Sequence, residues 1–178
     1  MSMENMRQSK IHIYVSPKLE SRSSHVAGQG LFAKDDIPKG ELLFDTSKIG
    51  EEYIISKTQA DKRFKKGFDY MLQIDEDKFL ITVDGESPSY YGFINSSCDP
   101  NCGIRESRRI VAMRDIMKDE EIAFDYAMSE SSDFKMPCLC GSDNCRKFIT
   151  GDDWKIKDLQ VRYKGFFSEY IQRKIDNI

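Results

Sequence analysis

Three cysteines within the segment CLCGSDNC, positions 138–145, form the most specific chemical motif of the chain. All five cysteines of the 178-residue sequence lie between positions 98 and 145, and an odd cluster of this kind does not suit a disulfide framework. Three thiolates turned by a glycine can wrap one tetrahedral zinc ion, which takes four ligands in a structural site. The spacing predicts a zinc site whose fourth ligand is Cys98 or Cys102, with buried free thiols as the alternative. His12 and His25 lie far away in sequence and are expected to be ordinary polar residues.

Two further segments carry side chains that suit ligand binding. Residues 93–102, FINSSCDPNC, are rich in Asn, Ser and Asp, whose side chains cap backbone groups and bind ligands. Residues 121–126, EIAFDY, close a predicted strand with an acid between two aromatic rings. Taken alone, the first segment is compatible with a plain loop, and Tyr126 would be interpreted as a core aromatic that ends a strand.

A glycine pair begins residues 28–33, GQGLFA, which formally match the dinucleotide-binding pattern G-x-G-x-x-G/A. That pattern requires a helix opening at the second glycine, whereas residues 34–40, KDDIPKG, predict a turn. We therefore exclude a dinucleotide-binding fold. The glycine pair still allows the backbone to approach a ligand or another strand closely.

The elements that must position these segments are short strands and few helices. A helix is expected at 56–66, capped by Ser56 and ended by Gly67. After a turn at 36–40 the chain returns as a strand, and the last two strands form another pair. The strands are expected at 11–15, 31–33, 41–44, 70–74 and 79–83 (a hairpin), 110–112 and 121–126.

Two longer patterns bear on organisation. Residues 33–41 and 112–120 align without gaps and share Ala, Asp, Ile, Lys and Glu, which predicts one strand–turn–strand unit used twice, with chance as the alternative. After Cys145, apolar residues recur every three to four positions, which predicts an amphipathic helical tail interrupted at Gly165. We expect this tail to cover the core, with partner binding as the alternative.

Composition excludes several classes of function. Lys and Arg number 27 and Asp and Glu 30, a net charge of −3 that argues against non-specific duplex binding. No apolar run approaches the roughly 18 residues of a membrane span, and residues 1–5, MSMEN, lack the apolar stretch of a signal peptide. We expect a soluble intracellular protein, cytoplasmic or nuclear, that binds neither a membrane nor nucleic acid directly.

Taken in order, the glycine pair, residues 93–101, residues 121–126 and the cysteine cluster followed by Arg146 resemble the SET-domain protein-lysine methyltransferases with a post-SET cysteine motif. The resemblance covers about residues 28–146, and the tail after Gly151 resembles that of small bacterial-type members. It implies an α+β, mainly β fold with short helices: a β-clip of small sheets around a knot-like crossing, followed by a helical C-terminal tail. The implied segments are a flexible N-terminus (1–9), the SET domain (10–130), a post-SET zinc segment (131–150) and a C-terminal helical extension (151–178).

The resemblance also implies S-adenosylmethionine as methyl donor and one structural zinc ion. Asn95 and Ser96 would meet the amino group and adenine of the cofactor, and Phe148 would cover the adenine. The methionine part would be held, partly through backbone, by Gly28, Gln29, Gly30 and Leu31. The zinc ligands would be Cys98, Cys138, Cys140 and Cys145, which leaves Cys102 as the spare thiol.

Catalysis would follow the same resemblance. Tyr126 would orient the lysine amine, and Phe124 and Tyr91 would line its channel, with Tyr70 and Tyr90 as further candidates. A phenylalanine at position 124 leaves room for further methyl groups, so the expected products are di- and trimethyl-lysine. The expected partner is a protein with an exposed lysine, histones being one such class; no oligomeric state is predicted.

Two positions depart from the family pattern. Ser96 stands where the family usually has His, and Gly92 where it often has Arg, so zinc binding is supported more firmly than cofactor affinity. The alternative functions are a catalytically weak or inactive SET-like zinc-containing module that binds cofactor or protein, and a zinc-dependent interaction module that binds no cofactor.

Overall fold

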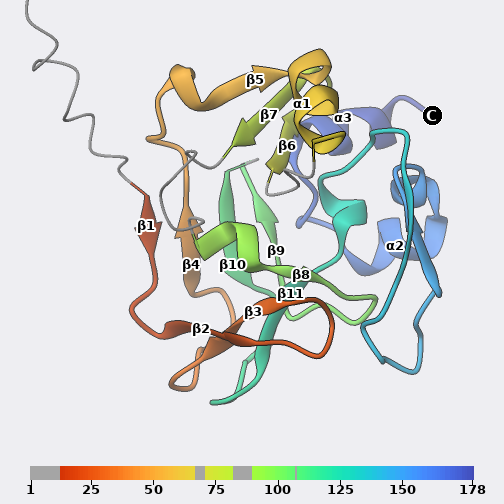
Figure 1. The fold of residues 1–178 in the computed structure, drawn as a ribbon. Coiled ribbons are helices and arrows are strands. Elements are labelled where there is room, and N and C mark those ends of the chain that lie inside the picture. The colour runs from red at the N-terminus through yellow and green to blue at the C-terminus, as the bar shows by residue number, and fades with distance from the viewer. Residues whose placement is uncertain (1–12, 67–70, 82–89, 107) are drawn as a thin grey trace, which may run out of the picture.

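Small antiparallel sheets make up most of the fold in the computed structural model, which describes residues 13–66, 71–81, 90–106 and 108–178 (Figure 1). Within these residues the strands form four sheets. The two larger sheets run β1(Tyr14–Val15)-β4(Leu42–Asp45)-β10(Arg109–Ala112)-β9(Cys102–Arg105) and β2(Leu19–Ser23)-β3(Gln29–Ala33)-β11(Glu121–Phe124)-β8(Asn95–Ser96). The smaller ones are β5(Ile54–Ser56)-β7(Lys78–Ile81)-β6(Met71–Asp75) and β12(Lys135–Pro137)-β13(Phe148–Thr150). The expected mainly β class with short helices is confirmed.

Local sequence signals explain several elements. Ser56 caps α1(Lys57–Phe64) in a capping box with Gln59, as the expected helix start requires. Strands β6 and β7 form the expected hairpin. The predicted end of the helix at Gly67, the N-terminus at 1–9 and Tyr70 lie outside the described residues. Short 3₁₀ turns complete the elements: η2(Glu51–Tyr53), η3(Tyr90–Phe93), η4(Tyr126–Met128) and η5(Asp153–Lys155).

The two similar segments, 33–41 and 112–120, pair with each other instead of folding back on themselves. Strand β3 pairs with β11, and β4 pairs with β10, so each strand–turn–strand unit divides its strands between two sheets. The expected local strand pairs, 31–33 with 41–44 and 110–112 with 121–126, are therefore wrong. An alternating apolar pattern identifies a strand and its buried face, but it carries no information about the partner strand.

Matched hydrogen bonds show that the same unit is used twice. The buried residues Ile37 and Ile116 exchange backbone hydrogen bonds of 2.8 and 2.9 Å. The other matched bonds run from Ala33 N to Glu120 O (3.0 Å) and Ala112 N to Glu41 O (3.0 Å), and from Lys39 N to Asp115 Oδ1 (2.7 Å) and Lys118 N to Asp36 Oδ1 (2.9 Å). The two turns thus interlock around one apolar contact, and the predicted repeat is confirmed.

The segment 95–101 holds both edges of β11. Strand β8 runs parallel to β11, with Asn95 opposite Ala123 and Ser96 opposite Phe124. The N–H of Ser97 donates to the Phe124 carbonyl at 3.1 Å, while the N–H of Asn101 donates to the Ala123 carbonyl at 3.1 Å. Successive carbonyls of a strand point to opposite edges, so one short segment engages both. This is the crossing that the resemblance implied.

The C-terminal tail covers the core, as expected. It contains α2(Lys157–Arg162) and α3(Glu169–Asp176), separated at Gly165, whose φ of +84° suits a glycine. The tail buries six side chains against the main core: Trp154, Leu159, Tyr163, Phe167, Tyr170 and Ile171. None of the helices in the described part of the chain is long and apolar enough to cross a bilayer.

We expect Ile116→Ala to lower the free energy of unfolding by about 2–5 kcal/mol, because it leaves a cavity between the interlocked turns. Met117→Ala is the control, since this neighbouring side chain in the same turn is 60% exposed; it should cost less than about 0.5 kcal/mol. Urea denaturation of both variants measures the difference. Equally small losses would contradict the interlocked arrangement.

Candidate active site and metal centre

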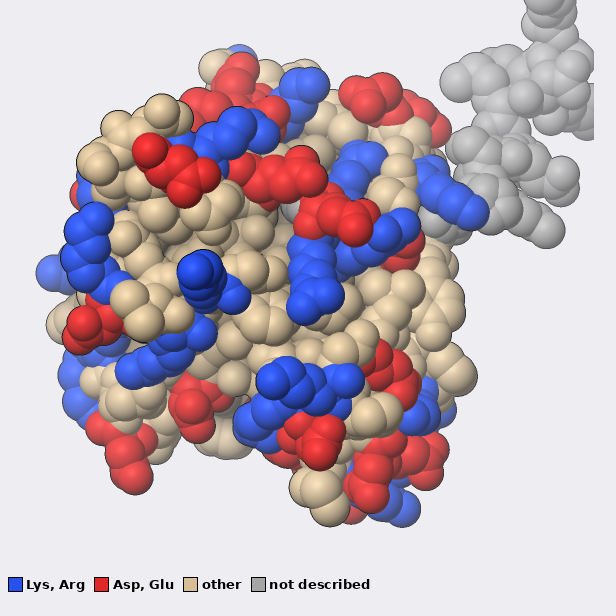
Figure 2. All heavy atoms as spheres, turned by 180° about the vertical axis from the view of Figure 1, so that it is seen from behind, with Lys and Arg blue, Asp and Glu red and all other residues tan. Residues whose placement is uncertain are grey.

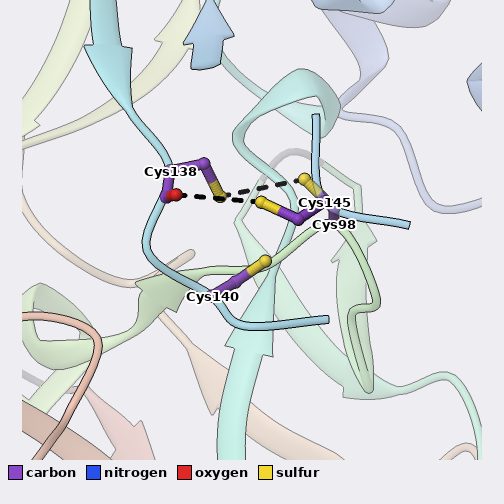
Figure 3. A group of neighbouring side chains, drawn as sticks. All are labelled: Cys98, Cys138, Cys140 and Cys145. Carbon is purple, nitrogen blue, oxygen red and sulfur yellow. Dashed lines mark hydrogen bonds between the residues drawn. The ribbon is translucent and has the colours of Figure 1, made fainter. Parts of the chain in front are cut away.

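Four cysteine sulfurs converge beside the crossing. The Sγ atoms of Cys98, Cys138, Cys140 and Cys145 all lie within 4.8 Å of one another (Figure 3). Cys98 and Cys138 bring their sulfurs to 3.8 Å. A tetrahedral zinc site with zinc–sulfur distances of about 2.3 Å has sulfur–sulfur edges of about 3.8 Å. The donor set and its spacing therefore fit one structural zinc ion.

A short hairpin brings three of these thiols together. Strands β12 and β13 pair antiparallel, and the N–H of Cys138 donates to the Lys147 carbonyl at 2.9 Å. Between them the loop turns at Gly141, which has a φ of +72°. Cys98 comes from the other side, in the loop after β8, so a bound metal would join the hairpin to the crossing.

The surroundings of the thiols explain why a metal would be needed to ionise them together. Burial raises the pKa of Cys98 and Cys138. Burial opposes ionisation of Cys140 as well, but hydrogen bonds with Ser142, Cys98 and Cys138 together outweigh it and lower the pKa of Cys140 to about 6. The backbone N–H of Arg146 lies 3.4 Å from the Cys98 sulfur, where it can stabilise a thiolate. Metal binding and thiol deprotonation are thus coupled here.

The fifth cysteine is not part of this cluster. Cys102 lies on β9, opposite Ala112, and is fully buried in the main core. Burial raises the pKa of its thiol. Sequence spacing left Cys98 and Cys102 open as the fourth ligand, and the structure brings Cys98 to the other three.

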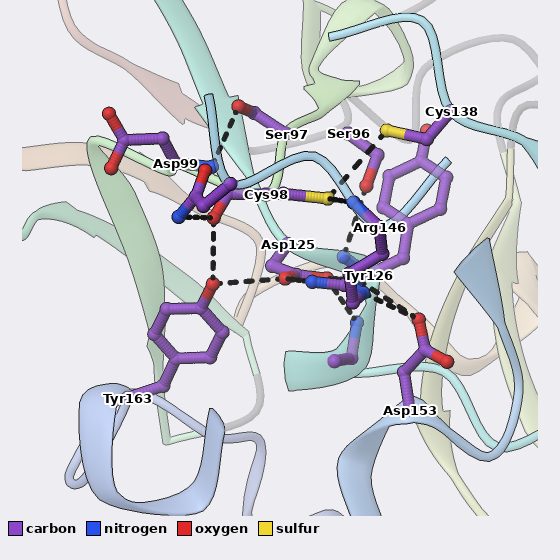
Figure 4. Close-up of polar contacts among 12 residues, drawn as sticks. Ser96, Ser97, Cys98, Asp99, Asp125, Tyr126, Cys138, Arg146, Asp153 and Tyr163 are labelled. Atoms are coloured by element: carbon purple, nitrogen blue, oxygen red, sulfur yellow. Dashed lines mark hydrogen bonds and ion pairs between the residues drawn. The ribbon is translucent and has the colours of Figure 1, made fainter. Parts of the chain in front are cut away.

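The parallel contact of β8 with β11 brings the predicted catalytic segment together (Figure 4). The N–H of Tyr126 donates to the Ser96 hydroxyl at 3.3 Å, and the Tyr126 hydroxyl donates to the Ile94 carbonyl at 3.4 Å. The rings of Phe124 and Tyr126 lie 5.2 Å apart, tilted by 48°. Phe124 is buried, while Tyr126 is partly buried and packs against both the main core and the cysteine cluster. The backbone of Tyr91 lies in η3, and its side chain is outside the described part of the structure.

The glycine strand meets the same crossing through Asn95. The Asn95 side-chain amide donates to the Gln29 carbonyl at 3.2 Å and to the Glu121 carboxylate at 2.7 Å. The Ser24 hydroxyl donates to the same carboxylate at 2.8 Å. A Cβ on Gly30 would lie only 2.4 Å from Glu121 Oε1, so a side chain at this position would displace the Glu121 carboxylate. Glu121 and Ser24 were missed by sequence reasoning, which read residue 121 only as part of a strand.

The remaining predicted cofactor residues differ in exposure. Gly28 has a φ of +45°, and the Gln29 side chain is exposed and bonded to Ser21. The Leu31 side chain is buried in the core, which leaves only its backbone for a ligand. Phe148 is 49% exposed on β13, with the Lys135 ammonium 4.6 Å from its ring centroid.

A buried polar network that sequence reasoning also missed lies beneath Tyr126 (Figure 4). Arg146 pairs with the fully buried Asp125 through two hydrogen bonds of 2.6 and 2.8 Å. It also contacts Asp153 at 3.0 Å, and the Tyr163 hydroxyl donates to Asp125 at 3.0 Å. Only the adjacency of Arg146 to Cys145 and of Asp125 to Tyr126 gave a signal in the sequence, because the partners lie far apart along the chain.

Comparison with known proteins identifies the family. The SET domain model matches residues 28–127, more than half of the chain, so the chain belongs to the SET-domain family. The resemblance of the sequence segments to this family is thereby confirmed. The methyltransferase domain of human histone-lysine N-methyltransferase SETMAR shares the fold, with a TM-score of 0.55 at 22% identity over 73% of this chain and 56% of that one.

Three relatives show how much of a longer protein the similarity covers. The H3 lysine-4 specific histone-lysine N-methyltransferase of Schizosaccharomyces pombe is 39% identical over 140 residues, which are 71% of this chain and 14% of that protein. Human histone-lysine N-methyltransferase 2B is 36% identical over 71% of this chain and 5% of its own length. Human SETD1B is 34% identical over 72% of this chain and 7% of its own length. The chain therefore spans a small part of the length of these relatives.

We expect Cys98→Ala to lose most bound zinc to a chelator and Cys102→Ala to retain it, because of these two thiols only that of Cys98 belongs to the cluster. Both thiols are fully buried, so Cys102→Ala is a matched control. Elemental analysis of the purified variants after chelator treatment measures the zinc content. The same zinc content in both variants would contradict the assignment of Cys98.

Proposed function

We propose that the chain is a protein-lysine N-methyltransferase that takes its methyl group from S-adenosylmethionine. The observation that carries the proposal is the meeting of Asn95 and Ser96 with Phe124 and Tyr126 where β8 runs beside β11. Strand β3 pairs with the same β11, and Tyr126 also packs against the cysteine cluster. Family membership and the histone-lysine methyltransferase relatives support the same activity.

The junction of β3, β8 and β11 has the chemistry to hold a cationic cofactor. When bound, S-adenosylmethionine supplies a methyl group on a positively charged sulfur. The Glu121 carboxylate accepts from Ser24 and Asn95, and His25 Nδ1 lies 4.0 Å from it; we assign the same carboxylate as an acceptor for the ammonium group of the cofactor. We assign the amino-acid part of the cofactor to this junction and to the backbone of residues 28–31.

Two further side chains complete the assigned cofactor site. Ser96, buried beside Asn95, would meet the cofactor together with it, while its hydroxyl also holds the N–H of Tyr126. We assign Phe148 to stack on the adenine base of the cofactor, because its large aromatic ring is half exposed on the post-SET hairpin.

The reacting lysine must lose its proton before it can attack. A lysine with a pKa near 10.4 is neutral only about once in 10³ at pH 7, and apolar walls favour the neutral form. The tilted rings of Phe124 and Tyr126 supply such walls, with Tyr91 as a further candidate. Because the Tyr126 hydroxyl donates to Ile94, its oxygen lone pairs can accept a hydrogen bond from the amine. Orientation of the amine, not a covalent intermediate, then supplies the rate.

The four clustered thiols would hold zinc as a structural ion. Cys98 belongs to the crossing, and Cys138, Cys140 and Cys145 belong to the hairpin that carries Phe148. The metal would therefore fix the assigned cofactor cover against the catalytic segment. This accounts for a metal site beside a reaction that needs no metal chemistry at the methyl group.

We propose histones as the first substrates to test, in a cytoplasmic or nuclear location. The relatives named above are histone-lysine methyltransferases, one of them specific for H3 lysine 4. The net charge of −3 suits a basic protein segment. On the face seen in Figure 2, basic and acidic side chains lie side by side, which argues against a phosphate-tracking surface there.

We expect Tyr126→Phe to lower kcat by about 100-fold or more while cofactor affinity is unchanged, since the variant loses only the hydroxyl that orients the amine. Transfer of labelled methyl groups to core histones measures turnover, and calorimetry measures cofactor binding. Tyr53→Phe, a partly buried tyrosine of η2, is the control and should keep full activity. Full activity of Tyr126→Phe would refute its role, and a wild-type chain that binds cofactor without transfer would favour the inactive module.

We expect Phe124→Tyr to shift the product toward monomethyl-lysine, because a hydroxyl at this buried position would hold the amine or a water molecule and restrict further additions. The unmodified chain should produce di- and trimethyl-lysine. Mass spectrometry of a lysine peptide after long incubation measures the ratio. Monomethyl product alone from the unmodified chain would contradict the role of Phe124.

A further inference from the structure

The Asp125 carboxylate is fully buried, and protein groups donate four hydrogen bonds to it. Its Oδ1 atom accepts from the N–H of Ala127 at 3.0 Å and from Arg146 Nη2 at 2.8 Å. Its Oδ2 atom accepts from Arg146 Nη1 at 2.6 Å and from the Tyr163 hydroxyl at 3.0 Å. Four donors match the roughly four acceptor sites of a carboxylate, so removal of any one leaves a buried acceptor unsatisfied.

This carboxylate fixes the turn that carries the assigned catalytic tyrosine. Asp125 is the N-cap of η4, which begins at Tyr126, and its bond to Ala127 closes that turn. The orientation of the Tyr126 backbone therefore depends on where the carboxylate is held. Arg146, next to Cys145, holds it from the side of the metal centre.

The C-terminal tail holds the same network and the metal centre together. The carbonyl of Cys98 accepts from Arg162 Nη1 at 3.2 Å and from Asn144 Nδ2 at 3.0 Å, with the Tyr163 hydroxyl at 3.4 Å. Tyr163 thus lies between the backbone of an assigned zinc ligand and the carboxylate beneath Tyr126.

We propose that Tyr163 is a positioning residue for methyl transfer, through which the C-terminal tail holds both the Tyr126 turn and the Cys98 backbone in place. This inference rests on the proposed function. Tyr163 lies outside residues 28–127, so the catalytic geometry of this chain depends on a segment that the SET match does not include.

The decisive variant is Tyr163→Phe, which removes the hydroxyl and keeps the ring that packs 6.2 Å from Phe167. We expect kcat to fall about tenfold with KM for peptide and cofactor unchanged, because a small misplacement of a reacting group lowers turnover strongly. Zinc content should stay the same, while zinc transfers to a chelator faster. A loss of packing alone would not separate kcat from KM in this way.

Leu159→Val is the control for lost packing. Leu159 belongs to the same tail and is buried in the main core, but its side chain is apolar and makes no hydrogen bond to Asp125 or Cys98. We expect its unfolding free energy to fall by a similar amount, with kcat and the rate of zinc transfer close to wild type. Equal losses of kcat in both variants would reduce Tyr163 to a stabilising residue and overturn the proposal.

A double-mutant cycle tests whether Tyr163 acts through Asp125. Asp125→Ala removes both carboxylate oxygens, and adding Tyr163→Phe should then lower kcat no further, since the first change already removes the acceptor of the Tyr163 hydroxyl at this position. Additive losses would overturn the proposed link. Wild-type kcat in Tyr163→Phe, with an active parent chain, would overturn this inference alone, whereas a parent chain that transfers no methyl would overturn the proposed function and this inference with it.

Discussion

The engagement of both edges of β11 by residues 95–101 is the constraint on which the site depends. Buried backbone groups need hydrogen-bond partners, and here Ser97 and Asn101 satisfy carbonyls on opposite edges of one strand. The register that follows places Asn95 opposite Ala123 and Ser96 opposite Phe124. It also leaves Cys98 in the loop between these contacts, facing the post-SET hairpin. One segment therefore fixes the candidate cofactor, catalytic and metal positions together.

The second constraint is the buried polar network around Asp125. A carboxylate with no solvent exposure needs a charged partner and a full set of donors; Arg146 supplies the charge and Tyr163 and Ala127 supply further donors to Asp125. These donors come from the loop that carries Cys145 and Arg146, from the C-terminal tail and from η4. The carboxylate therefore fixes the positions of the three segments relative to one another. Apolar packing stabilises the tail on the core, and this polar network fixes the position of the tail relative to η4 and to the loop that carries Arg146.

The sequence predicts local elements and chemical segments better than it predicts their partners. The Ser56 cap, the hairpin within 71–81, each copy of the repeated unit and the cysteine motif at 138–145 depend on neighbours in the chain, and the structure bears them out. The pairing of β3 with β11 could not be derived, since a period-two pattern is silent on partners. The contacts of Asp125 with Arg146 and of Glu121 with Asn95 join residues far apart in sequence. The choice of Cys98 over Cys102 depends on where the fold places two equally buried thiols, one beside the hairpin and the other on β9, which spacing does not encode.

The position of the metal cluster along the chain has a consequence for biosynthesis. Cys98 becomes part of the crossing only when β11 is present, and its three sulfur neighbours are synthesised after β11. Tyr163, which contacts the carbonyl of Cys98, emerges later still. The strands of the two larger sheets end at Phe124, and folding begins as chains leave the ribosome, so these sheets can assemble before the site does. A nascent chain would therefore hold folded sheets with an incompletely organised candidate site until residues of the tail have emerged.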